Sequence, residues 1–132
     1  MHNDHNEVPA AVEAIGVAIL DAAFKVHRTL GPGLLEGAYE AFLAHELERT
    51  NHKVDRQLAL PAIFEGARVG IGFRLDLMVD DLVPVEIKAV EQLLPVHEAQ
   101  LLTYLRLSRR KLGYLINFNV AMLKQGIKRK VM

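Results

Sequence analysis

Apolar residues recur at helical spacing near the start of the chain, between residues 9 and 30. They fall three or four positions apart, which places them on one face of a helix. These positions are Val12, Ile15, Ile19, Ala23, Val26 and Leu30. The helix ends at the Gly-Pro-Gly segment, because Gly31 suits the left-handed C-terminal position and Pro32 cannot continue the helix. A second helix is predicted over residues 34–50.

After residue 50 the pattern changes first to strand-like alternation and later returns to helical spacing. The predicted elements are strands over 54–64, 67–79 and 83–90, a helix over 94–110, a strand over 111–118, and a helical turn followed by a short strand in the tail. The predicted order is therefore α-α-β-β-β-α-β, with a further β-strand at the end. Such an order is typical of a single mixed α/β domain with one central sheet.

Charged residues interrupt two of these apolar strands. Because side chains alternate along a strand, the third strand has one apolar face and one face with Glu86 and Lys88. The strand before it is expected to have one apolar face, formed by Phe73, Leu75, Leu77 and Val79. Its opposite face is expected to carry Arg74, Asp76 and Met78. A three-residue loop at 80–82 places Asp76 opposite Glu86, whereas a two-residue loop places Asp76 on the wrong face. We predict the three-residue loop.

Two carboxylates that face each other repel unless a positive charge lies between them. A divalent cation such as Mg²⁺ binds oxygen ligands and is commonly held by one or two carboxylates. Lys88 would then hold an attacking water or stabilise negative charge on a phosphate. The alternative is a cross-strand salt bridge on a solvated sheet face. The spacing alone does not decide between the two.

Asp76 followed by Glu86-Ile87-Lys88 resembles the D-x(n)-E-x-K signature of the PD-(D/E)XK nuclease superfamily. The segment GLLEGAY, residues 33–39, is similar to the Gly-x-x-Glu-x-x-Tyr motif of the GxxExxY family within that superfamily. HEAQLLTYLR followed by GYLINF resembles the later helix and strand of that family. The similarity extends over roughly residues 10–130, although Leu75 stands where the superfamily's name places a proline.

The resemblance implies a restriction-endonuclease-like α-β-β-β-α-β core, with a mixed central sheet flanked by helices. It also implies hydrolysis of phosphodiesters in nucleic acid with Mg²⁺ or Mn²⁺ as cofactor. The implied metal ligands are Asp76, Glu86, the carbonyl group of Ile87 and Glu36. The implied catalytic residues are Lys88, Glu86, Asp76 and Gln100.

Further candidates lie on the predicted helices over residues 34–50 and 94–110. Gln100 and Tyr104 are four residues apart and so share a helix face, as in the exonuclease-like branch of the superfamily. Tyr39, three residues after Glu36, is a candidate for substrate contact together with Tyr104. Each also has a structural explanation: Glu36 favours a helix N-terminus, the tyrosines suit a core, and Gln100 suits a hydrogen bond to a strand.

The net charge is zero, yet the charges are unevenly distributed. Residues 1–100 carry 16 acidic and 8 basic residues, and residues 101–132 carry 8 basic residues and no acid. Arg106, Arg109 and Arg110 are therefore candidates for contact with phosphate. The alternative is that the basic third pairs with the acidic remainder, within the fold or across a dimer. Charge alone favours the alternative, because nucleic-acid-binding domains usually have a basic excess.

The chain has no cysteine, no apolar run of membrane-spanning length and no secretory signal at its N-terminus. We therefore expect a cytoplasmic protein with no membrane partner, with residues 1–8 frayed and residues 9–132 forming the nuclease-like domain. The predicted function is a nuclease or nuclease-like phosphodiesterase, with DNA ahead of RNA as the substrate and a homodimer left open. The alternatives are a catalytically silent nucleic-acid-binding or assembly module on the same fold, and a purely structural role.

Overall fold

The computed structural model describes residues 7–132, so residues 1–6 of the segment expected to be frayed lie outside it. The described elements are α1 (Ala10–Leu30), α2 (Glu36–Arg49), β1 (Val54–Phe64), β2 (Ala67–Val79), β3 (Val83–Lys88), α3 (Pro95–Ser108), β4 (Leu112–Asn117), the 3₁₀ turn η2 (Leu123–Gly126) and β5 (Ile127–Val131). Their order confirms the predicted one, including the helical turn and the short final strand.

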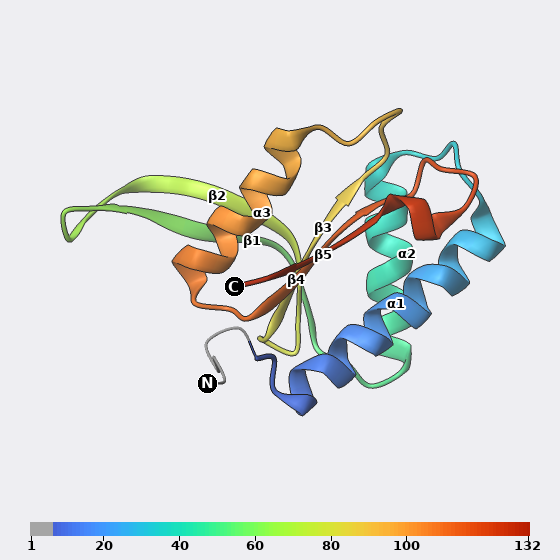
Figure 1. Cartoon of the computed structure of the whole chain (residues 1–132), viewed down its shortest axis with the longest axis horizontal. Helices are drawn as coiled ribbons and strands as arrows, with labels where there is room; N and C mark the ends of the chain where they lie inside the picture. Colours follow the sequence, from blue (N-terminus) through green and yellow to red (C-terminus); the bar gives the residue numbers. More distant parts are fainter. Residues whose placement is uncertain (1–6) are drawn as a thin grey trace, which may run out of the picture.

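The five strands form one mixed sheet in the order β1-β2-β3-β4-β5. Strands β3 and β4 are parallel, and the other neighbouring pairs are antiparallel. Helices α1 and α2 cover one face of the sheet and α3 covers the other (Figure 1). No helix in the described part of the chain is long and apolar enough to cross a membrane.

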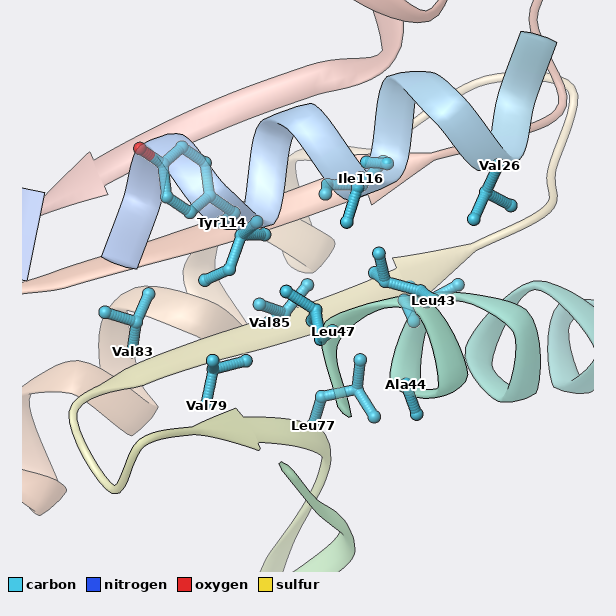
Figure 2. Close-up of a cluster of buried hydrophobic side chains, with 14 of the residues drawn as sticks. Val26, Leu43, Ala44, Leu47, Leu77, Val79, Val83, Val85, Tyr114 and Ile116 are labelled. Atoms are coloured by element: carbon cyan, nitrogen blue, oxygen red, sulfur yellow. The ribbon is translucent and has the colours of Figure 1, made fainter. Parts of the chain in front are cut away.

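The main core lies between the sheet and helices α1 and α2. Figure 2 shows Leu43 and Leu47 of α2 beside Leu77 and Val85 of the sheet, with Val26 of α1 nearby. The apolar face predicted for β3 therefore packs on the helices, as expected. The opposite face of β3, which bears Glu86, is turned toward α3.

The loop between β2 and β3 has the length that the predicted register requires. Val79 pairs with Val83, so three residues, 80–82, lie between the paired positions. Asp80 and Asp81 have φ values of 52° and 58°, and Leu82 N donates to Val79 O at 3.0 Å. Asp80 also accepts a hydrogen bond from Lys53 N at 2.8 Å, which ties the turn to the start of β1. The three-residue loop is therefore confirmed.

The alternation predicted for β2 is wrong at Leu75. Leu75 packs with Met78 and Tyr104 on the α3 side, although it was expected on the same face as Leu77. β2 pairs with β3 only between Leu77 and Val79. The part of β2 before Leu77 pairs with β1 alone, and the two form a hairpin that extends beyond the other three strands (Figure 1). The strand bends where it leaves β3, so side chains on either side of Asp76 do not keep one common face.

Gly16 lets α1 approach β4 closely, and this contact gives a stability prediction. A Cβ at Gly16 would lie 2.7 Å from the hydroxyl of Tyr114 and 3.1 Å from a methyl group of Leu112. Gly16→Ala is expected to lower the free energy of unfolding by about 1–2 kcal/mol, because overpacking outweighs the better helix propensity of alanine. Gly37→Ala should raise the free energy of unfolding by about 0.5–1 kcal/mol, because a Cβ added at Gly37 meets open space and alanine favours a helix more than glycine does. Urea unfolding of both variants would measure this, and equal effects would contradict the close approach.

Candidate functional site

Asp76 and Glu86 face each other where β2 and β3 separate. Asp76 N donates to Glu86 Oε1 at 3.0 Å, and Ile87 N donates to Asp76 Oδ2 at 2.8 Å. Each carboxylate thus binds the backbone of the opposite strand, beyond the last paired position of the ladder. The two side chains are also buried, at 8% and 6% exposed. Two acidic groups are therefore held side by side in a largely desolvated position.

The two carboxyl groups carry an electrostatic cost in this position. Burial and the neighbouring Asp76 raise the pKa of Glu86 to about 7. Burial also raises the pKa of Asp76, against the hydrogen bond from Ile87 N that lowers it. The backbone hydrogen bonds do not cancel the cost of burial. The pair therefore favours a proton or a cation in its vicinity.

Lys88 and Glu36 lie within electrostatic range of this pair. Lys88 is half-buried at the end of β3, and its ammonium group lowers the pKa of both Asp76 and Glu86. Glu36 is the first residue of α2 and is exposed. The residue as a whole is exposed, but partial burial of its carboxyl raises the pKa of Glu36, and Lys88 lowers it. The fold thus brings together three carboxylates and one lysine from α2, β2 and β3.

A profile described as the PD-(D/E)XK nuclease superfamily matches residues 13–130, which is most of the chain. The chain belongs to the PD-(D/E)XK nuclease superfamily. Membership indicates a nuclease-like function, and the mixed sheet with its flanking helices is consistent with the restriction-endonuclease-like fold of PD-(D/E)XK proteins. No curated protein and no solved structure matches the chain.

PD-(D/E)XK nucleases generally use divalent metals, and the donors of this domain suit such an ion. The carboxylates of Asp76 and Glu86 are hard oxygen donors, which Mg²⁺ and Mn²⁺ bind. Each retains lone pairs beyond its hydrogen bond to the backbone. Among residues 7–132, no three His, Asp or Glu side chains converge as a metal cage. Mg²⁺ commonly needs only one or two carboxylates, because water and phosphate oxygens complete its coordination.

Helix α3 of this PD-(D/E)XK domain places Tyr104 against the site from the other side. Tyr104 is buried, and its ring lies 5.3 Å from that of Phe73. Burial raises the pKa of Tyr104, Arg110 lowers it and Glu86 raises it, so its hydroxyl lies within range of both charges. Gln100, one turn earlier on α3, is exposed. Tyr104 therefore lies within electrostatic range of Glu86 on β3 and of Arg110 just after α3.

The structure places Tyr39 in the core. Its ring stacks on Phe118 with centroids 4.7 Å apart, and its hydroxyl donates to Gly31 O at 2.6 Å. The same hydroxyl accepts a hydrogen bond from Leu34 N at 3.1 Å. Tyr39 therefore holds the loop that precedes α2, and through that loop it orients the helix that bears Glu36.

Five of the eight basic residues of the C-terminal third form two groups. Arg129 pairs with Glu13 at 2.8 Å and Lys130 pairs with Glu98 at 2.5 Å, so for these two the pairing within the fold is confirmed. Arg106 and Arg109 are exposed on or just after α3. Arg110 is half-buried, and its Nε is buried without a hydrogen-bond acceptor among the described residues. The guanidinium of Arg110 thus has an unused donor near Tyr104.

Two residues near the site were not predicted from the sequence. Glu40, one turn after Glu36 on α2, is buried and accepts hydrogen bonds from Arg56 and Gln57. Gln57 also donates to Asp76 Oδ1 at 3.3 Å. The four-residue spacing of Glu36 and Glu40 is the signal that could have placed Glu40 on the same helix face. Nothing in the sequence around Gln57 marks its link to Asp76.

Proposed function

We propose that this chain is a divalent-metal-dependent phosphodiesterase that cleaves nucleic acid, with DNA ahead of RNA. The observation that carries the proposal is the buried pair of Asp76 and Glu86, with Lys88 nearby, in which each carboxylate accepts a hydrogen bond from the backbone of the opposite strand. A salt bridge made only for stability would neutralise its charges locally. Here the pKa of both carboxyl groups is raised, so a cation would stabilise the pair.

In this proposal Asp76 and Glu86 hold Mg²⁺ or Mn²⁺ together with the carbonyl group of Ile87, and Glu36 completes the site through a bridging water. The bound ion would supply Lewis-acid polarisation of a phosphate oxygen. Lys88, on the same strand face as Glu86, would hold the attacking water or stabilise negative charge that develops on the phosphate.

Residues of α3 and of the segment after it would hold the nucleic-acid backbone. The positive charge of half-buried Arg110 supports attraction of a phosphate group. Exposed Arg106 and Arg109 would add positive charge, and Gln100 would contact the substrate near the metal. The Gly33, Glu36 and Tyr39 pattern supports placement in the GxxExxY family, with residues 9–132 as the nuclease domain.

The proposal predicts metal-dependent cleavage. The full chain should be incubated with labelled single- and double-stranded DNA and RNA, with Mg²⁺ or Mn²⁺ and with EDTA. We expect cleavage of at least one substrate with metal, none with EDTA, and a loss of activity in Asp76→Ala, because that variant removes a ligand. Binding should weaken steeply as salt rises, because phosphate contacts release counterions.

The same binding and cleavage assays also distinguish the proposed nuclease from the alternative, a catalytically silent nucleic-acid-binding module. Salt-sensitive binding of nucleic acid without cleavage, at metal concentrations that saturate the wild-type chain, would favour a non-catalytic module. Cleavage that persists unchanged in Asp76→Ala would reject the site itself.

A further inference from the structure

Gln57 of β1 joins a buried glutamate to one of the site carboxylates. Its Nε2 donates to Glu40 Oε1 at 2.6 Å and to Asp76 Oδ1 at 3.3 Å. Carboxylate oxygens only accept hydrogen bonds, so the amide must point its NH₂ group at both. The two hydrogens of that group are thereby directed to two acidic residues from different elements, α2 and β2.

The backbone at Gln57 is bent to allow this contact. Gln57 has a φ of 52°, in the left-handed region that a glutamine rarely adopts. Consecutive side chains of a regular strand point to opposite faces, yet Arg56 and Gln57 both reach the carboxylate of Glu40. The left-handed residue breaks the alternation at this point. Unfavourable backbone conformations of this kind persist where surrounding contacts enforce them, and they cluster at functional sites.

Glu40 serves as the fixed end of this arrangement. It is 6% exposed, and its Oε2 pairs with the guanidinium of Arg56 at 3.0 Å. Its other oxygen accepts the short bond from Gln57, so both oxygens of Glu40 are engaged. Through the longer bond, Gln57 Nε2 donates to Asp76 Oδ1, and Ile87 N donates to Asp76 Oδ2. Each oxygen of Asp76 thus has one protein donor and retains a lone pair.

We infer that Gln57, anchored by Glu40 and Arg56, is a positioning residue that orients the Asp76 carboxylate for a divalent cation. The inference rests on the proposed function, since it assigns Asp76 as a ligand. Residues that hydrogen-bond to metal ligands from outside the coordination shell orient those ligands and tune their affinity. Gln57 acts on the ion only through Asp76.

The test compares Mn²⁺ binding to Gln57→Gly and to the wild-type chain by calorimetry. Loss of such a hydrogen bond typically weakens metal affinity by about 10- to 100-fold, and we expect that loss here. Glycine accepts the positive φ, so relief of strain offsets the lost hydrogen bond and Tm should stay close to the wild-type value. Glu65→Gly is the matched control, because Glu65 has a φ of 50° in the turn at the far end of the hairpin. It should leave Mn²⁺ affinity unchanged, and wild-type affinity in Gln57→Gly would overturn the inference.

Gln57→Asn gives a second variant, since asparagine tolerates positive φ but its side chain is one methylene shorter. It should show the same loss of Mn²⁺ affinity as Gln57→Gly. In nuclease assays at saturating Mn²⁺, both variants should regain most of their kcat with an unchanged KM for nucleic acid. A purely structural role would instead lower Tm without changing the metal dependence.

A metal-free readout separates this inference from the proposed function. The side-chain amide of Gln57, identified by the resonances that Gln57→Gly lacks, should shift in the nitrogen–proton spectrum of both Glu40→Ala and Asp76→Ala. If the wild-type chain binds no Mn²⁺, the proposed function fails, and the resonances still decide whether Gln57 positions Asp76. Resonances unchanged in both variants would overturn the inference.

Discussion

Lys88→Met is expected to lower kcat for phosphodiester cleavage by about 10²- to 10³-fold, the typical effect of removing one donor that stabilises transition-state charge. Methionine keeps much of the apolar stem of lysine and removes the ammonium group. Because Lys88 lowers the pKa of Glu86 and Asp76, protons will compete more strongly with the metal for these carboxylates in the variant near neutral pH. The rate should therefore be measured at saturating Mn²⁺ and at pH values above 8, where most of the Glu86 carboxyl is ionised. A deficit in kcat that persists there belongs to the lysine itself.

Lys53→Met is the matched control for this substitution. Lys53 lies at the start of β1, where its ammonium pairs with Asp81 at 3.0 Å in an exposed position. Exposed pairs of this kind contribute little to stability, so cleavage should be unchanged. Equal rates for Lys88→Met and the wild-type chain at saturating metal would remove Lys88 from the catalytic site.

Glu86→Gln is expected to raise the stability of the metal-free protein at pH 8 by about 3 kcal/mol. The pKa of Glu86 rises from 4.5 to about 7 in the folded chain. Between those values the folded state holds a proton that the unfolded state has released. The free energy of unfolding of the wild-type chain therefore falls as the pH rises through this range. Glutamine removes the ionisation and keeps an oxygen to accept the bond from Asp76 N.

Urea unfolding in EDTA between pH 4 and pH 8 would measure this effect. The wild-type chain and Glu86→Gln should have similar stability at pH 4 and diverge as the pH rises. Glu48→Gln, on an exposed position of α2, should follow the wild-type curve. Added Mn²⁺ should stabilise the wild-type chain at pH 8 and leave Glu86→Gln unchanged, because in our proposal the ion needs the intact carboxylate pair. Parallel curves for wild type and Glu86→Gln would show that Glu86 carries no such cost.

The two expected results describe one trade-off between stability and function. We expect the buried pair of Asp76 and Glu86 to destabilise the metal-free fold near neutral pH, and in our proposal the same unmet charge provides the affinity for a cation. Functional sites commonly retain such locally unfavourable arrangements. Glu86→Gln would show this trade-off directly if it is more stable than the wild-type chain and binds no metal.

Much of the site could be predicted because it depends on local rules. Strand alternation and loop length were sufficient to place Asp76 opposite Glu86, and the three-residue loop at 80–82 confirmed that register. The same rules failed at Leu75, because they assume a straight strand and β2 bends where it leaves β3. The pairing of Arg129 with Glu13 joins residues 116 positions apart, and local sequence patterns do not predict contacts between residues so far apart in the chain.

The sequence by itself determined the order of the elements, the apolar faces of the helices and the register of the hairpin, because these follow from periods of 3.6 and 2 residues and from turn length. Only the tertiary structure decided how strongly Asp76 and Glu86 are buried, and hence that their pKa values are raised. It also decided that Gln57 takes a left-handed backbone and connects Glu40 of α2 to Asp76 of β2. Burial and such bridges depend on how distant segments pack around one point, which no local period encodes.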